Sequence, residues 1–122
     1  MADLVAPGWP AEVLPPQVPD WEQSAVAWLL DLCPPDYRAV PVLRRYPVVL
    51  ARFAAGHVEA NVQAARNGLK GLRAELRDLV PPDVVEAALA AYDLEGRRLV
   101  RAGRQIALVD AALRGQRWVP RL

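Results

Sequence analysis

The segment RDLVPPDVVE, residues 77–86, separates two long stretches of helical pattern in this chain of 122 residues. Proline has no backbone N–H, and it forces the residue before it out of helical geometry. Val80-Pro81-Pro82 therefore predicts the end of one helix, and Pro82 can occupy the first position of the next. Asp83 then falls in the first turn, where a carboxylate suits the positive end of the helix dipole. We expect a hinge here.

Before the hinge, residues 47–79 predict one long helix that carries a regular apolar seam. The seam residues follow one another at alternating steps of 3 and 4, the spacing of a coiled coil. They are Val48, Ala51, Ala55, Val58, Val62, Ala65, Leu69, Leu72, Leu76 and Leu79. The opposite face is expected to be solvated, and it carries Arg52, Glu59, Gln63, Arg66, Lys70, Arg73 and Arg77.

A second stripe of small or polar residues lies beside this seam: Leu50, Ala54, His57, Asn61, Ala64, Gly68, Gly71 and Glu75. A glycine inside a helix costs up to about 1 kcal/mol relative to alanine. Either another helix approaches closely at Gly68 and Gly71, or the helix bends there. We favour a close approach, because the seam continues through both glycines without a break.

After the hinge, residues 82–114 predict a second long helix with the same spacing. Its stripe consists of Ala88, Tyr92, Glu95, Leu99, Ala102, Ile106, Val109 and Leu113. Two helices of similar length joined by a tight hinge are expected to pack as an antiparallel hairpin. Gly115 is the expected C-cap of the second helix.

Residues 1–19 form a proline-rich segment that excludes a regular helix or a central strand. Such a segment could serve as a polyproline ligand for an aromatic groove of a partner. We favour an extended arm that lies over the protein's own helices and is anchored by Trp9 and Leu14. At the other end, residues 116–122 are expected to form a tail in which Trp118, Val119 and Leu122 could contact the helices or a neighbour.

A shorter helix is predicted over residues 20–32, with Asp20 as its N-cap and Gln23 as a capping-box partner. Its apolar stripe is Trp21, Ala25, Trp28, Leu29 and Leu32, which indicates a core-facing helix. Cys33-Pro34-Pro35 ends it, and short helical turns are expected over residues 36–46, with Leu43 facing inward.

These elements predict an all-α protein, with residues 20–115 as its helical domain. A hairpin of two helices cannot bury both sides of its seams by itself. The helix over residues 20–32 can supply a third wall, and a second copy of the chain can supply the rest. We therefore expect a homodimer that completes a helical bundle.

Composition sets broad limits on function. A single cysteine, Cys33, excludes an intrachain disulfide. No signal peptide is recognisable at the start of the chain, and no apolar stretch approaches the roughly 20 residues of a membrane helix. A cytoplasmic location is the default expectation.

The sequence contains no catalytic, cofactor-binding or metal-binding motif. His57, Cys33 and Ser24 are each the one residue of their type. A catalytic pair among them would need an orienting group and an oxyanion site that no motif indicates. We interpret His57 as a structural residue bonded to Asn61, one turn away, and Cys33 as a small buried side chain. An enzyme with a pocket near His57 is the weakest hypothesis.

Charge is distributed unevenly along the chain. Residues 1–36 contain six acidic side chains and no basic one, whereas residues 96–122 contain seven arginines and one aspartate. The two ends are expected to attract each other, within a chain or between chains.

Four of those arginines, Arg97, Arg98, Arg101 and Arg104, are spaced to gather on one side of a helix and form a candidate partner-binding strip. Such a strip could contact phosphates, although it lacks interleaved aromatic residues. The alternative is a solvated face neutralised by Asp93 and the acidic N-terminal segment. The leading hypothesis is a non-enzymatic helical interaction or scaffold protein acting as a homodimer; it includes an unidentified further protein partner. The alternative is a small nucleic-acid-associated accessory protein that uses the arginines.

Overall fold

A computed structural model describes residues 5–121 of the chain, and in this range the protein is helical without strands. The helical segments are α1 (Trp21–Asp31), the 3-10 turn η1 (Pro35–Ala39), α2 (Pro41–Arg45), α3 (Pro47–Leu76) and α4 (Pro82–Leu113). The all-α fold class is confirmed. Residues 1–4 of the expected arm and Leu122 of the expected tail lie outside the described residues.

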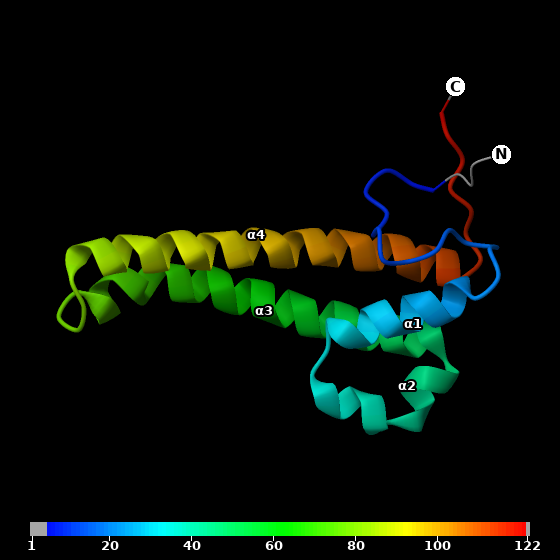
Figure 1. The fold of residues 1–122 in the computed structure, drawn as a ribbon, viewed down its shortest axis with the longest axis horizontal. Helices are drawn as coiled ribbons and strands as arrows, with labels where there is room; N and C mark the ends of the chain where they lie inside the picture. The colour runs from blue at the N-terminus through cyan, green and yellow to red at the C-terminus, as the bar shows by residue number, and fades with distance from the viewer. Residues whose placement is uncertain (1–4, 122) are drawn as a thin grey trace.

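Helices α3 and α4 pack along each other over their whole lengths as an antiparallel pair (Figure 1). Helix α3 ends at Leu76, three residues earlier than predicted, and the chain then turns. The amides of Leu79 and Val80 both donate to the carbonyl of Leu76, at 2.9 and 3.2 Å. Pro81 is extended, and Pro82 is the first residue of α4. The hinge is therefore confirmed.

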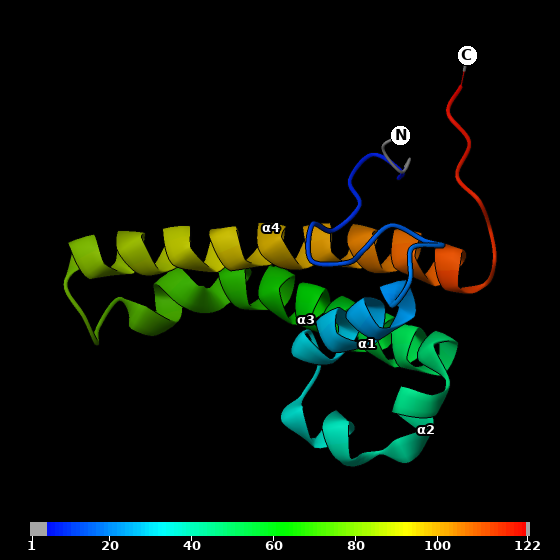
Figure 2. The ribbon, with the colours of Figure 1, turned by 45° about the vertical axis from the view of Figure 1, so that its right-hand side comes forward.

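The remaining elements gather around one half of this pair. Figure 1 and Figure 2 both show α1, η1, α2, the N-terminal arm from residue 5 and the tail up to residue 121 at the end of the pair away from the hinge, while the hinge end projects alone. We call residues 47–62 of α3 and 99–113 of α4 the proximal half. Residues 63–76 of α3 and 82–98 of α4 form the distal half. The main apolar core lies between the proximal half and the elements that cover it. It comprises Val13, Ala25, Trp28, Leu29, Leu30, Cys33, Leu43, Leu50, Ala51, Ala54, Val58, Val62, Leu99, Ala102, Ile106 and Val109.

The buried face of α3 differs from the predicted seam. Leu50 and Ala54, which the sequence placed in the flanking stripe, are fully buried, whereas the seam residue Ala55 is exposed. The reason is that the proximal half of α3 is contacted by α1 as well as by α4. Because α1 and α4 contact α3 from different directions, the centre of its buried face lies between these two contacts.

The close helix approach predicted at the glycines takes a different form at Gly68 and is wrong at Gly71. The side chain of Tyr92 in α4 packs directly on Gly68. The space at Gly71 is bordered instead by Glu75 of the same helix. One aromatic ring, not a second backbone, therefore occupies the gap that the small residue leaves.

The described part of the N-terminal arm lies against the helices through a series of turns. Trp9 packs against Trp21 of α1 at a ring-centre distance of 6.4 Å, and its indole N–H donates to the carbonyl of Val13 at 2.9 Å. Val13 is buried, whereas the predicted anchor Leu14 is exposed. The backbone amide of Leu14 instead donates to the hydroxyl of Ser24, at 2.9 Å.

The predicted cap at Asp20 is wrong. Asp20 adopts a left-handed backbone conformation with a φ of 69°, and its side chain makes no capping hydrogen bond. A turn from Val18 to Trp21 delivers the chain into α1, through a backbone hydrogen bond of 3.1 Å. By contrast, the stripe of α1 is confirmed as core-facing, with Ala25, Trp28 and Leu29 buried.

The end of α4 is confirmed at Gly115. This glycine has a φ of 83°, and its amide donates to the carbonyl of Ala112 at 3.0 Å. The next amide, that of Gln116, donates to the carbonyl of Ala111 at 3.0 Å. This pair of bonds is the Schellman motif, which requires the left-handed conformation that glycine adopts without strain. Beyond it, Trp118 and Val119 of the tail are exposed.

Candidate interaction groove between α3 and α4

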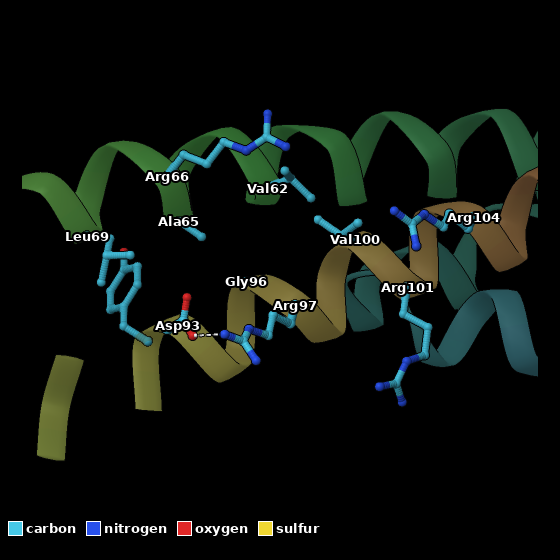
Figure 3. Close-up of a pocket in the computed structure, with 11 residues that line it drawn as sticks. Val62, Ala65, Arg66, Leu69, Asp93, Gly96, Arg97, Val100, Arg101 and Arg104 are labelled. Carbon is cyan, nitrogen blue, oxygen red and sulfur yellow. Dashed lines mark ion pairs between the residues drawn. The ribbon is translucent and has the colours of Figure 1, made fainter. Parts of the chain in front are cut away.

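A groove of about 440 Å³ runs along one side of the helix pair, where the proximal and distal halves meet. Figure 3 shows its walls, with α3 on one side and α4 on the other. The half-buried side chains of Ala65, Leu69 and Val100 line it together with the buried Val62. The other lining residues are Arg66, Tyr92, Asp93, Gly96, Arg97, Arg101 and Arg104. The result is an apolar floor between rims that carry charge.

Small residues of both helices meet at the floor of the groove. A Cβ atom added to Gly96 of α4 would lie 3.9 Å from the Cβ atom of Ala65 in α3. With no long side chain rising at this point, the two helices leave an open trough between their outer rims.

Positive charge predominates in the groove, which contains four arginines and one aspartate. Arg97 pairs with that aspartate, Asp93, at 3.1 Å. Arg66, Arg101 and Arg104 are exposed, and no ion pair within residues 5–121 engages them. Three guanidinium groups are thus available to a ligand or partner.

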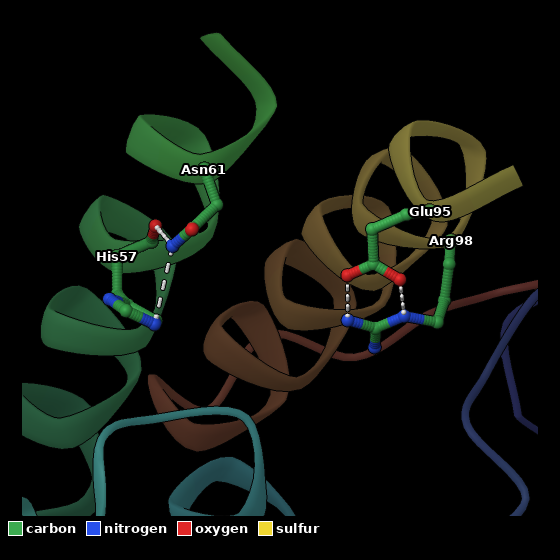
Figure 4. A network of polar contacts seen from close by, with 4 residues as sticks. All are labelled: His57, Asn61, Glu95 and Arg98. Carbon is green, nitrogen blue, oxygen red and sulfur yellow. Dashed lines mark hydrogen bonds and ion pairs between the residues drawn. The ribbon is translucent and has the colours of Figure 1, made fainter. Parts of the chain in front are cut away.

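The structure brings together three of the four arginines predicted as a strip. Arg98 is not part of the groove. It binds both carboxylate oxygens of Glu95, at 2.8 and 2.6 Å, as Figure 4 shows. This bidentate hydrogen bond lowers the pKa of Glu95 and raises that of Arg98. The fourth arginine of the groove is therefore not the predicted one.

The fourth arginine is Arg66, which lies on α3, opposite the arginines of α4. The sequence placed Arg66 on a solvated face, and its exposure agrees with that assignment. Its position across the groove from Arg97 depends on how the two helices are aligned, which a pattern within one helix does not contain.

Within the described residues, no ion pair joins an acidic side chain of residues 5–36 to an arginine of residues 96–121. Asp31 pairs instead with Arg38, at 2.7 Å. Attraction between the chain ends is therefore not seen within this chain, and Asp3 lies outside the described residues.

A second hollow, of about 490 Å³, lies between α1 and the segment around η1 and α2. Its lining combines Glu22 and Asp31 with Arg38, Arg44 and Arg45, so its charges largely offset one another. The groove between α3 and α4 is the stronger candidate, because its charge is mainly of one sign.

The residues with catalytic potential are occupied by local partners. Asn61 donates to the backbone carbonyl of His57 at 2.8 Å, and its amide nitrogen lies 3.3 Å from the His57 ring (Figure 4). The pairing predicted for His57 is confirmed. The hydroxyl of Ser24 donates to the carbonyl of Trp21 at 2.6 Å, and Cys33 is buried. Neither hollow described above is lined by any of these three.

Two further properties concern residues 5–121 as a whole. No group of three or more histidine, cysteine, aspartate or glutamate side chains in this range could hold a metal ion. Among the same residues, no helix combines the length and the apolar character needed to cross a membrane.

Comparisons of this chain with protein-family models, with curated proteins and with solved structures found no match.

Proposed function

We propose that this chain is a non-enzymatic helical interaction protein that acts as a homodimer, with the distal half of the hairpin and its groove as the contact surface. The observation that carries this proposal is the incomplete burial of the distal half. Among residues 63–98, Val85 is the one buried side chain. The same two helices are well buried where α1 covers them.

Apolar side chains of the distal half remain partly exposed because two helices have no third layer there. Leu69, Leu72, Leu76 and Leu89 are half-buried, and Leu79 and Leu94 are 74% and 69% exposed. Complete burial of a leucine is worth about 1.5–3 kcal/mol. A partner that covers several of them gains enough to compensate for the entropy lost on association.

A second copy of the chain is the partner that best fits this surface. It offers another pair of antiparallel helices of the same length, and two such pairs form a four-helix bundle. Small residues at Ala65 and Gly96 leave room for a helix to approach the floor of the groove. The enzymatic alternative has less support, since His57, Ser24 and Cys33 lie away from the groove.

Sedimentation velocity of the pure protein tests the proposal. We expect a species of about twice the chain mass of 13.4 kDa at micromolar concentration. Leu69→Glu, on the floor of the groove, should shift the protein to monomer while circular dichroism stays helical. Val42→Glu, on the exposed surface of α2, is the matched control and should leave the dimer intact. A wild-type protein that sediments as 13.4 kDa at high micromolar concentration overturns the proposal.

The second candidate function is association with nucleic acid, which the three exposed and unpaired arginines of the groove favour. Phosphate contacts of this kind weaken steeply with salt. Fluorescence anisotropy with labelled DNA and RNA at low salt tests it directly. Absence of binding there removes this candidate and leaves the homodimer unaffected.

A further inference from the structure

We propose that the groove receives helix α4 of a second copy in antiparallel orientation, so that the acidic first half of one α4 faces the arginines of the other. This inference rests on the proposed homodimer and specifies its geometry.

One edge of α4 carries charge that changes sign along the length of the helix. Charged residues recur on this edge at the 3- and 4-residue steps that keep side chains on one side of a helix. The acidic residues come first, Asp83, Glu86 and Asp93, and the basic residues follow, Arg97, Arg101 and Arg104. The last four of these six line the groove. The sign therefore reverses between Asp93 and Arg97, toward the end of the groove nearer the hinge.

The charges of this edge are complementary to those of the same edge in a second copy when the two α4 helices are antiparallel. Asp93 and Arg97 lie two residues on either side of Glu95, and Glu86 and Arg104 lie nine residues on either side. A two-fold axis near Glu95 would thus place Asp93 opposite Arg97 of the partner and Glu86 opposite the partner's Arg104. Symmetry repeats each pair, which gives four ion pairs between the chains. In a parallel arrangement like charges would face each other and repel.

The groove has the shape that this arrangement needs. Next to the proposed axis, Gly96 of α4 meets Ala65 of α3 in the same chain, so no long side chain stands in the way of the partner's helix there. On the same edge, Ala90 and Val100 are symmetric about Glu95, so an apolar contact accompanies the ion pairs. Glu86 and Arg104 are about 27 Å apart along a helix, at 1.5 Å per residue. Helices that cross at about 20° can stay in contact over this length.

Intrachain pairs leave these groups free to bind a partner. Glu86 pairs with Arg73 of α3, and Asp93 pairs with Arg97, but the two carboxylates are 61% and 49% exposed. A carboxylate has about four acceptor positions and can serve two arginines. Arg101 and Arg104 have no acidic partner within residues 5–121.

A second copy would pair with both the acidic and the basic residues of this edge. An acidic peptide or a nucleic acid would pair with the arginines alone. A phosphate backbone that continued along α4 would meet Asp83 and Glu86 and be repelled by them. The acidic half therefore favours the second copy.

Charge exchange in the full-length chain tests the arrangement. Glu86→Arg alone and Arg104→Glu alone should each raise the dimer dissociation constant by about tenfold or more, because like charges then face each other. The combined Glu86→Arg/Arg104→Glu variant should restore the wild-type constant, since the exchanged residues again face opposite charges. Glu22→Arg, on α1, is the control and should change the constant little. A dimer dissociation constant that neither single reversal changes overturns the arrangement.

Cross-linking gives an independent measurement in a Cys33→Ala background. We expect a disulfide between chains when the Glu86→Cys and Arg104→Cys variants are mixed and oxidised, and none when either is oxidised alone. Cross-linking of each variant with itself indicates a parallel arrangement and overturns the inference. A wild-type protein that is monomeric in sedimentation overturns the homodimer as well. DNA or RNA that binds this monomer through Arg101 and Arg104 would then assign the groove to nucleic acid.

Discussion

The ring of Tyr92 in α4 lies so close to Gly68 in α3 that a Cβ atom added to Gly68 would stand 2.8 Å from the Cζ atom of Tyr92. Real Cβ atoms essentially never come this near to a carbon of another side chain. The glycine thus marks the point where the distal halves of the two helices are held together by an aromatic side chain.

Gly68→Ala should therefore fail to give the gain of up to about 1 kcal/mol that alanine normally brings to a helix interior, because the half-buried Tyr92 must move. The added methyl group must displace Tyr92 from its position. Urea unfolding followed by circular dichroism measures the change.

The same exchange at Gly56 is the matched control, since no atom lies within 4 Å of a Cβ built there. Gly56→Ala should stabilise the protein by up to about 1 kcal/mol, because alanine is the better helix former. In a Tyr92→Ala background, Gly68→Ala should also become stabilising. A loss of stability there would mean that Tyr92 is not the obstacle.

Leu29 of α1 should be essential for stability. Its side chain is fully buried in the proximal core, with 0% exposure. Leu29→Ala is expected to cost about 2–5 kcal/mol through lost burial and the cavity that remains. Val42→Ala, at a side chain 45% exposed on α2 and outside the proposed contact surface, should change the free energy of unfolding by less than about 0.5 kcal/mol. Equal losses at the two positions would show that α1 is not packed as described.

Stability should decrease in acid through two carboxylates of α4. Hydrogen bonds from Arg73 and Arg98 lower the pKa of Glu86 and Glu95, respectively, below the ordinary value of 4.5. A carboxylate whose pKa is lower in the folded state stabilises the fold above its unfolded pKa. That contribution is present at neutral pH and is lost as the pH falls from about 4.5 through the lower folded value.

The Glu86→Gln/Glu95→Gln variant tests this sign. Its free energy of unfolding should lie below that of the wild type at pH 7, and the difference should vanish in strong acid. High salt should also reduce the difference, because both pairs are exposed and screened. A difference that stays constant between pH 7 and pH 2 would contradict the assignment.

Cys33 should react slowly with thiol reagents in the folded protein. Burial raises the pKa of its thiol above the ordinary value of 9.0, which leaves little of the reactive thiolate at pH 7.5. Labelling with a coloured disulfide reagent should be slow in buffer and should reach one thiol per chain rapidly in urea. Rapid labelling without urea would place Cys33 at the surface.

Much of the helical architecture could be predicted because its signals are local. The hinge at Pro81-Pro82, the stripe of α1, the C-cap at Gly115 and the pairing of His57 with Asn61 each depend on residues within about one or two helical turns. Two local predictions, at Asp20 and Leu14, were wrong because the surrounding chain decides these positions. Asp20 has the residue type of an N-cap, but the turn that precedes it sets a left-handed backbone, so its carboxylate makes no capping bond. Leu14 was expected to be the anchor of the arm, and the neighbouring Val13 is buried instead.

In the candidate groove, the arginines that share one helix could be predicted from the sequence, and the arginine on the other helix could not. The spacing of Arg97, Arg101 and Arg104 placed them on one side of α4, as the structure has them. The same spacing also admitted Arg98, which lies at the border of that face and binds Glu95. Arg66 was missed because it belongs to the other helix.

The sequence by itself thus determined that the chain forms helices, where the long pair folds back, and which charges follow one another along α4. Only the tertiary structure decided that Leu50 and Ala54 replace Ala55 in the core, that Tyr92 packs on Gly68, and that Arg66 faces the arginines of α4. The physical reason is that helix periodicity specifies the angle of each side chain about its own axis. The rotation and alignment of one helix against another come from packing with every neighbour at once, here α1 together with α4.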